Sequence, residues 1–63
     1  MWNYRLTYSP VNKLYAMREV YYTEGAPDSW TANAVGVVGE SPEDVANVLK
    51  RMKLALKKGV LVI

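Results

Sequence analysis

The six residues from Gly39 to Asp44 constrain the fold of this chain more than any others. Ser41 suits the N-cap of a helix, where its hydroxyl accepts a hydrogen bond from an unpaired backbone N–H of the first turn. Pro42 follows at the first helical position, where no N–H is needed, and Glu43 and Asp44 bring negative charge to the positive end of the helix dipole. The junction therefore predicts that extended structure ends here and that a single helix follows.

The residues before this junction show the alternation of a sheet. Large apolar side chains occupy every second position of the first run: Trp2, Tyr4, Leu6 and Tyr8. Such alternation predicts a half-buried strand. The turn formers Ser9 to Asn12 separate it from a second apolar run over 13–23, so the two runs predict a hairpin. A loop over 9–12 would pair the strands in one register: Tyr8 with Lys13, Leu6 with Tyr15, and Tyr4 with Met17.

Gly, Pro, Asp and Ser gather between residues 24 and 29 and predict a loop. A third strand is expected over about 30–38, with Gly36 and Gly39 marking a bulge and the strand end. The helix is expected from Pro42 to about residue 57 or 58. Its apolar residues recur at helical spacing on one stripe: Val45, Val48, Leu49, Met52, Ala55 and Leu56.

Gly59 suits the position after the helix, where φ is often positive. The apolar tail 60–63 should pack as a short strand, over the core, or against another subunit. The sequence thus predicts one α+β domain over residues 1–63, with a three-stranded antiparallel meander and one C-terminal amphipathic helix packed on one face.

A chain of 63 residues buries only a small core, and chains of this size usually need a further source of stability, such as a disulfide, a bound metal or a partner subunit. The chain has no Cys and no His, which excludes disulfides and removes the commonest metal ligands. Self-association is the remaining source of stability, and we expect a homodimer. The candidates for the dimer interface are five aromatic residues and one leucine: Trp2, Tyr4, Tyr15, Tyr22, Trp30 and Leu54. The alternative interpretation is that the aromatic residues form core and cross-strand pairs and that Leu54 is an ordinary exposed residue.

Charge is distributed unevenly along the chain. Residues 1–49 hold three basic and six acidic residues, whereas residues 50–63 hold five basic residues and no acid. These five form the candidate nucleic-acid surface: Lys50, Arg51, Lys53, Lys57 and Lys58. They could neutralise phosphates while exposed aromatic rings stack on unpaired bases. The alternative reading is a solvated helix face with dipole-compatible lysines.

No catalytic motif is found, and we expect neither an enzyme nor a bound cofactor or metal. Without His or Cys, acid–base chemistry would depend on carboxylates, tyrosines and lysines, and helix capping explains Glu40, Glu43 and Asp44. The N-terminus lacks the pattern of a signal peptide, and no apolar run is long enough for a membrane helix. A cytoplasmic location without membrane attachment is therefore expected. The function expected first is a non-enzymatic protein-interaction or regulatory module, and the alternative is nucleic-acid binding.

Several patches resemble a family of small uncharacterised bacterial proteins: Met1 to Arg5, Arg18 to Tyr22, Trp30-Thr31, Val38 to Ser41, and Met52 to Leu56. This resemblance implies no known activity and supplies no catalytic residues. The stretch from Gly39 to Ala46 is also similar to the strand–helix junction of the antitoxin family known as HicB. That similarity implies a β-β-β-α topology more than it implies toxin binding.

Overall fold

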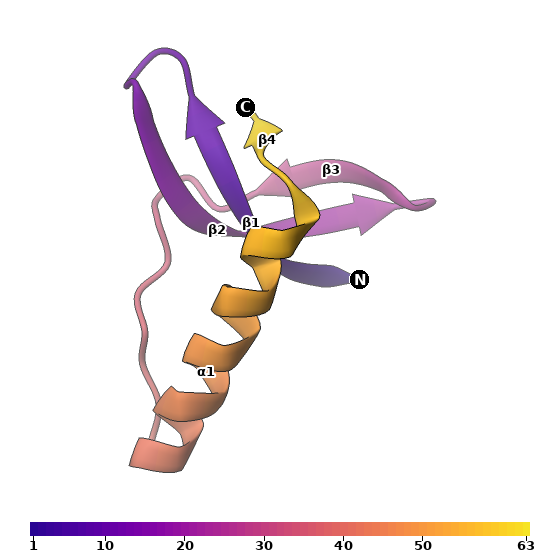
Figure 1. Ribbon diagram of the computed structural model, residues 1–63. Helices are drawn as coiled ribbons and strands as arrows, with labels where there is room; N and C mark the ends of the chain where they lie inside the picture. Colours follow the sequence, from indigo (N-terminus) through magenta and orange to yellow (C-terminus); the bar gives the residue numbers. More distant parts are fainter.

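The chain folds into a curled four-stranded sheet and one helix, which a computed structural model describes from Met1 to Ile63 (Figure 1). The elements are β1 (Trp2–Ser9), β2 (Leu14–Thr23), β3 (Ala26–Trp30), α1 (Pro42–Ala55), a 3₁₀ turn η1 (Leu56–Lys58) and β4 (Leu61–Val62). The strand order is β3-β2-β1-β4, with β4 parallel to β1 and the other pairs antiparallel. The α+β class is confirmed, but the sheet is mixed because the tail contributes a fourth strand.

The β1–β2 hairpin forms, although its register differs from the predicted one by two residues. The observed partners are Tyr8 with Tyr15, Leu6 with Met17, and Tyr4 with Glu19. Lys13 does not join the strand, because it adopts a left-handed φ of 58° and its N–H closes the turn on the carbonyl of Ser9 at 2.7 Å. A shift of two residues leaves every side chain on its expected face.

β3 lies where the sequence predicted a loop. Glu24 and Gly25 both have positive φ, 53° and 81°, and form a tight two-residue turn after β2. Pro27 is tolerated in β3 because this strand lies at the sheet edge, where one row of N–H groups has no strand partner. The bulge occurs where β3 pairs with Tyr21 and Tyr22, and not at Gly36 as predicted.

The predicted strand over 30–38 is wrong, since regular structure ends at Trp30 and residues 31–41 are irregular. The segment still follows β2, with backbone bonds from Thr31 N to Glu19 O and from Val35 N to Met17 O, each 3.0 Å. Arg18 explains the change of path, because its Nη1 donates to the carbonyls of Thr31 and Ala32 at 2.7 and 2.6 Å.

Arg18 also changes which sheet face is buried. Its Nε donates to the Thr7 hydroxyl at 3.1 Å, and that hydroxyl donates to the Ala16 carbonyl. Thr7, Arg18 and Val20 are buried and lie on one face of the hairpin. The opposite, aromatic face contains no fully buried residue, so the face that carries Asn3, Arg5 and Thr7 lies deeper.

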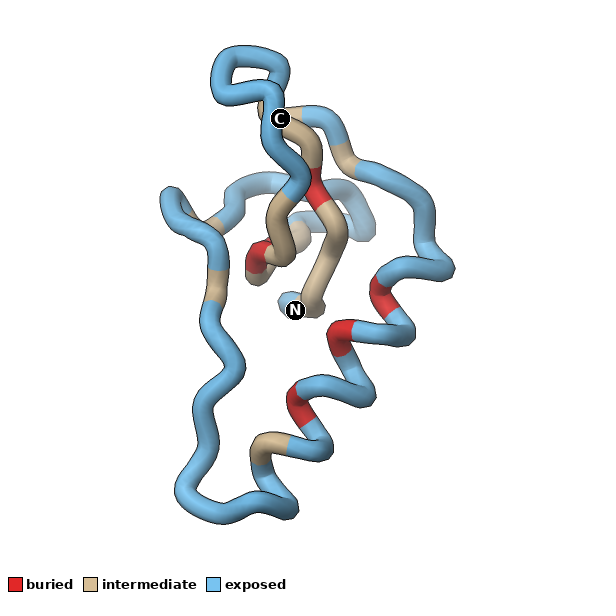
Figure 2. The backbone as a smooth tube through the Cα atoms, turned by 60° about the vertical axis from the view of Figure 1, so that its left-hand side comes forward, coloured by how far each residue is buried: buried red, intermediate tan, exposed pale blue.

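Helix α1 begins as predicted. The Ser41 hydroxyl accepts from Asp44 N at 3.1 Å, Pro42 occupies the first turn, and the Asp44 carboxylate accepts from Glu40 N at 3.3 Å. Of the predicted stripe, Val48, Met52 and Ala55 are buried, whereas Leu49 and Leu56 are about half exposed. The C-terminal end of the helix meets β1, while its first turns extend beyond the sheet (Figures 1 and 2).

The tail takes the first of its three predicted courses. Gly59 has a φ of 81°, as expected after the helical segment, and turns the chain back toward the sheet. Leu61 and Val62 then pair with Thr7 and Tyr8, and Ile63 N donates to Tyr8 O at 3.0 Å. β1 therefore has a strand partner on each side.

Little of the molecule is buried (Figure 2). Only 6 of 63 residues are buried, and two of these are Thr7 and Arg18. Large apolar side chains remain exposed on the hairpin, the irregular segment, the helix and the tail. More large apolar side chains are exposed than are buried in the core.

Candidate functional site

A pocket of about 460 Å³ lies between β1 and the C-terminal part of the helical segment. Its walls come from two elements far apart in the sequence: Trp2, Asn3 and Tyr4 of β1, and Arg51, Leu54, Ala55 and Lys58 of α1 and η1. This volume lies within the range typical of small-molecule sites. The pocket forms because the short tail returns to β1 and holds the end of the helix beside that strand.

Two aromatic rings form the β1 wall. Trp2 and Tyr4 lie on the same face of the strand, with ring centroids 5.2 Å apart and planes at 90°. This edge-to-face arrangement is favourable and fixes both rings. Trp2 remains 42% exposed, so part of its indole is accessible to a ligand.

Arg51 faces this wall from the helix, with its guanidinium carbon 5.6 Å from the centroid of the Tyr4 ring. A cation over an aromatic face is attracted by the ring quadrupole. The contact holds the charge of Arg51 at the pocket, where the second basic lining residue is Lys58. No carboxylate lines the pocket, so its electrostatic character is positive.

Asn3 also lines the pocket, but its side chain leaves β1 on the sheet face opposite Trp2 and Tyr4, the face of its strand partner Val20. Its Oδ1 is buried and has no hydrogen-bond partner. Because that oxygen is out of reach of solvent, it is not an acceptor for a ligand in the pocket, and the rings and cations are the groups that a ligand can contact.

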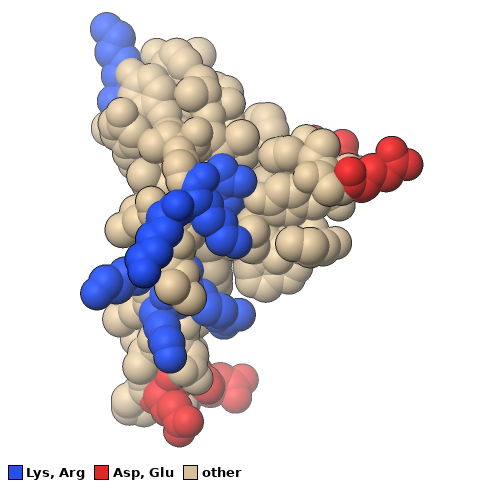
Figure 3. All heavy atoms as spheres, turned by 45° about the vertical axis from the view of Figure 1, so that its right-hand side comes forward, with Lys and Arg blue, Asp and Glu red and all other residues tan.

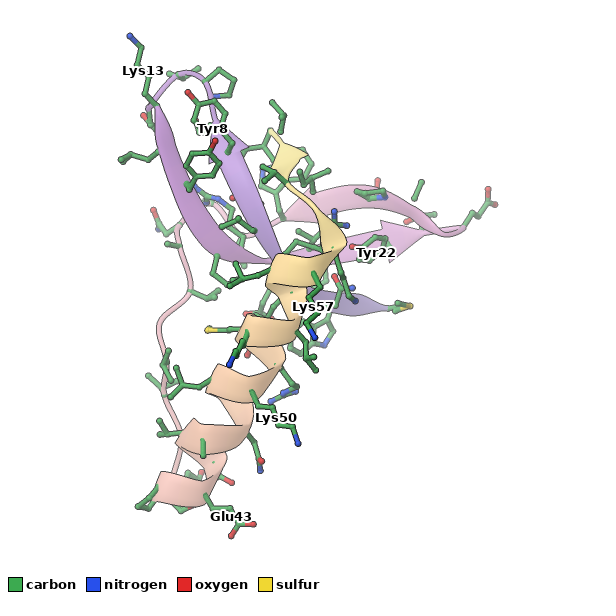
Figure 4. All side chains as sticks on the ribbon, viewed as in Figure 1. Tyr8, Lys13, Tyr22, Glu43, Lys50 and Lys57 are labelled. Carbon is green, nitrogen blue, oxygen red and sulfur yellow. The ribbon has the colours of Figure 1, made fainter.

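Basic side chains concentrate along the helix (Figure 3). Acidic residues lie at the start of the helix and toward the β2–β3 turn, and none follows Asp44 in the chain. Lys50 and Lys57 point away from the helix, while Glu43 lies at its opposite end (Figure 4). All five predicted basic residues are exposed, and two of them, Arg51 and Lys58, line the pocket.

The six predicted interface residues do not form one surface. Trp2, Tyr4 and Leu54 meet in the pocket. Tyr15 lies near the hairpin turn, its ring 4.7 Å from that of Tyr8, on the same face as Trp2 and Tyr4.

The remaining two interface candidates lie on the opposite face. Tyr22 is half-buried, and its hydroxyl accepts from Arg5 Nη1 at 3.0 Å. Trp30 pairs with the buried Val20 at the end of β3. Sequence reasoning missed Asn3, since an alternating strand gives no sign of which polar residue will be buried.

The carboxylates take structural positions. Asp44 caps the helix, and Asp28 accepts from the Thr23 hydroxyl at 3.1 Å beside the β2–β3 turn. Glu19 accepts from the Tyr21 hydroxyl at 3.3 Å. Loss of solvent around the ring, then the charge of Glu19 and this hydrogen bond, raise the pKa of Tyr21 above its ordinary value.

Comparison of the chain with family models, with curated proteins and with solved structures found no match. The two resemblances drawn from the sequence therefore stay predictions. The single helix falls short of the length and apolar character required to cross a bilayer.

Proposed function

We propose that this protein is a self-associating protein-interaction module, and that a second copy of the chain covers the apolar flank of α1. The observation that supports this most directly is the amount of exposed apolar surface. Fourteen large hydrophobic side chains are exposed, against four buried hydrophobic residues. Isolated exposed apolar residues are ordinary in a monomer, but an excess over the core of this size is not.

The total surface supports the same reading. A folded monomer of 7.1 kDa is expected to expose about 4,100 Å². The chain exposes 4655 Å². The excess of roughly 550 Å² approaches the ~800 Å² that each partner contributes to a standard protein interface.

The helix supplies the surface best suited to a second copy. Val45, Leu49 and Leu56 follow one another at spacings of four and seven residues, beside the buried line of the stripe. This spacing places side chains in a row that can pack against a partner helix. The first turns of α1 extend past the sheet (Figure 1), and Leu49 and Leu56 of this row are exposed, whereas Val45 is half-buried.

Sedimentation equilibrium tests the proposal directly. At micromolar concentration we expect a species of about twice 7.1 kDa, with dissociation on dilution. A single species near 7.1 kDa over the whole concentration range would contradict it. Size-exclusion chromatography with light scattering gives an independent mass.

Binding of single-stranded nucleic acid is the second candidate function. It is favoured by the acid-free run after Asp44, whose basic side chains lie along the helix (Figure 3), and by the rings of Trp2 and Tyr4, which line the pocket with Arg51 and Lys58. Phosphate contacts would make binding fall steeply with salt. Titration of labelled single-stranded RNA and DNA at low ionic strength tests it, and absence of binding there would remove this candidate.

A further inference from the structure

We infer that the pocket between β1 and the helix binds one nucleoside monophosphate unit, either as a free nucleotide or as part of a single strand. The inference deepens the second candidate function and rests on it, but it is independent of self-association. It assigns binding of the nucleotide to the residues that line the pocket, and not to the whole basic surface of the helix.

The first requirement on a ligand comes from the rings. Trp2 offers an accessible indole, and Tyr4 meets it edge to face at 5.2 Å. A flat heteroaromatic base can stack on such a ring whatever its sequence identity. Leu54 and Ala55 close the apolar side opposite the strand.

The second requirement is negative charge. Arg51 and Lys58 both line the pocket, and no acidic side chain does. The Tyr4 ring already holds the Arg51 guanidinium in place. A planar guanidinium with several N–H donors suits a phosphate, and Lys58 adds a flexible second cation.

One small ligand must meet both requirements, because the rings and the cations line the same pocket. A fatty acid offers charge without a ring, and inorganic phosphate does the same. A base joined to a phosphate carries a flat ring and a negative charge in one unit.

Nuclear magnetic resonance of the intact chain locates the site. Adenosine monophosphate is titrated into labelled protein in which Trp30→Phe leaves Trp2 as the only indole. We expect saturable shifts at the Trp2 indole N–H and the Arg51 Nε–H, with much smaller shifts at Lys53. Inorganic phosphate and adenosine are the partial probes, and each should bind at least about tenfold more weakly than the whole nucleotide.

Variants separate the pocket from the general charge. Arg51→Gln should weaken binding of adenosine monophosphate by about tenfold or more, because it removes a charged donor. Lys53→Gln, which removes the same charge outside the pocket, should change it by less than about threefold. Equal weakening by the two variants, or shifts spread along the helix without change at Trp2, would overturn the inference. The spectra of the free variants show whether each is folded.

One further ligand identifies the source. An oligoadenylate that binds at least tenfold tighter than the mononucleotide, with the same shifts at Trp2, places the unit in a strand; equal affinity indicates a free nucleotide. Oligonucleotide binding that is lost on changing Lys50 and Lys53, with no response at Trp2 or Arg51, would overturn the pocket site while leaving the second candidate function intact.

Discussion

Arg18 decides the path of the chain more than any other residue. Its guanidinium is buried without a carboxylate partner and uses its donors on Thr7 and on two carbonyls of the segment after β3. A buried charge is tolerated only when its donors are satisfied. These contacts hold residues 31 and 32 against β2 and prevent that segment from continuing as a regular strand.

Arg18→Lys keeps the charge but loses the planar fork, so one ammonium must replace both Nε, which donates to Thr7, and Nη1, which donates to the two carbonyls, and at least one of these bonds is lost. We expect the free energy of unfolding to fall by about 1.5–3 kcal/mol. Urea denaturation at a fixed protein concentration measures it. The exposed exchange Lys53→Arg is the control and should stay within about 0.5 kcal/mol. Equal stability of Arg18→Lys and the parent protein would show that the fork is not needed.

Tyr21 is a second single residue with a testable effect, because its ionisation makes the stability of the fold depend on pH. Its pKa lies above the ordinary 10.0, through partial desolvation and then through Glu19. A pKa raised by folding means that the native state holds its proton more tightly than the unfolded chain. The associated stability is fully present below pH 10.0 and is lost as the pH rises through the folded pKa.

Glu19→Gln should lower the pKa of Tyr21 part of the way toward 10.0, because it removes the charge and leaves the desolvation. The pH titration of the labelled tyrosine ring carbons measures this, and one of the five tyrosines should respond. Glu24→Gln, at the β2–β3 turn, should leave the titration unchanged. An unaltered Tyr21 titration in Glu19→Gln would contradict the assigned cause.

At the scale of the elements, the sequence predicted what local chemistry determines. Ser41 and Pro42 mark the helix start, Gly59 marks the turn after it, and the alternation over 2–8 marks β1. The course of residues 24–38 was predicted wrongly because it depends on tertiary context. Pro27 reads as a loop residue until β3 is known to be an edge strand, and the carbonyls that Arg18 would bind cannot be read from the sequence.

For the candidate site, too, the sequence predicted the local features but not those that depend on tertiary contacts. Aromatic rings at alternate positions and basic residues on the helix were visible in the sequence. Their meeting in one pocket was not, because it depends on the tail pairing in parallel with β1. The predicted interface set therefore divides between two faces of the sheet.

The junction before α1 also requires a close approach that only glycine allows. A Cβ at Gly39 would lie 2.7 Å from Asp44 Cβ and 3.0 Å from Val45 N. Gly39→Ala must displace the helix start, and we expect a loss of about 1–3 kcal/mol. Gly36→Ala is the matched control, because no atom lies within 4 Å of its added Cβ. The control should be neutral or slightly stabilising, by up to about 1 kcal/mol. Equal midpoints of thermal unfolding for the two variants would refute the steric argument.

At the scale of the whole molecule, the balance between core and surface is the main physical problem. Six buried residues leave a chain of this size marginal by itself. The parallel pairing of β4 protects one side of β1, but it adds little apolar burial, since Val62 remains 64% exposed. Association is the means by which such a chain gains core without lengthening its sequence.

A charge on the apolar flank of the helix should therefore abolish association. Leu49→Glu places a carboxylate in the proposed helix–helix contact and leaves it without a partner there. Within the helix the same change gains an i, i+4 pair with Lys53, so the helix itself is not weakened. Loss of association can then be attributed to the surface.

Asn47→Glu is a matched control. It introduces the same carboxylate at an exposed helical position, where the i, i+4 pair with Arg51 is offset by the like charges of Glu43 and Asp44 on the preceding turn. We expect sedimentation equilibrium to give about twice 7.1 kDa for the parent and for Asn47→Glu, and 7.1 kDa for Leu49→Glu. The thermal midpoint should rise with protein concentration in the first two and stay constant in the third. A dimer that persists in Leu49→Glu would move the contact away from this helix flank, because an unpaired charge buried in an apolar interface costs several kcal/mol.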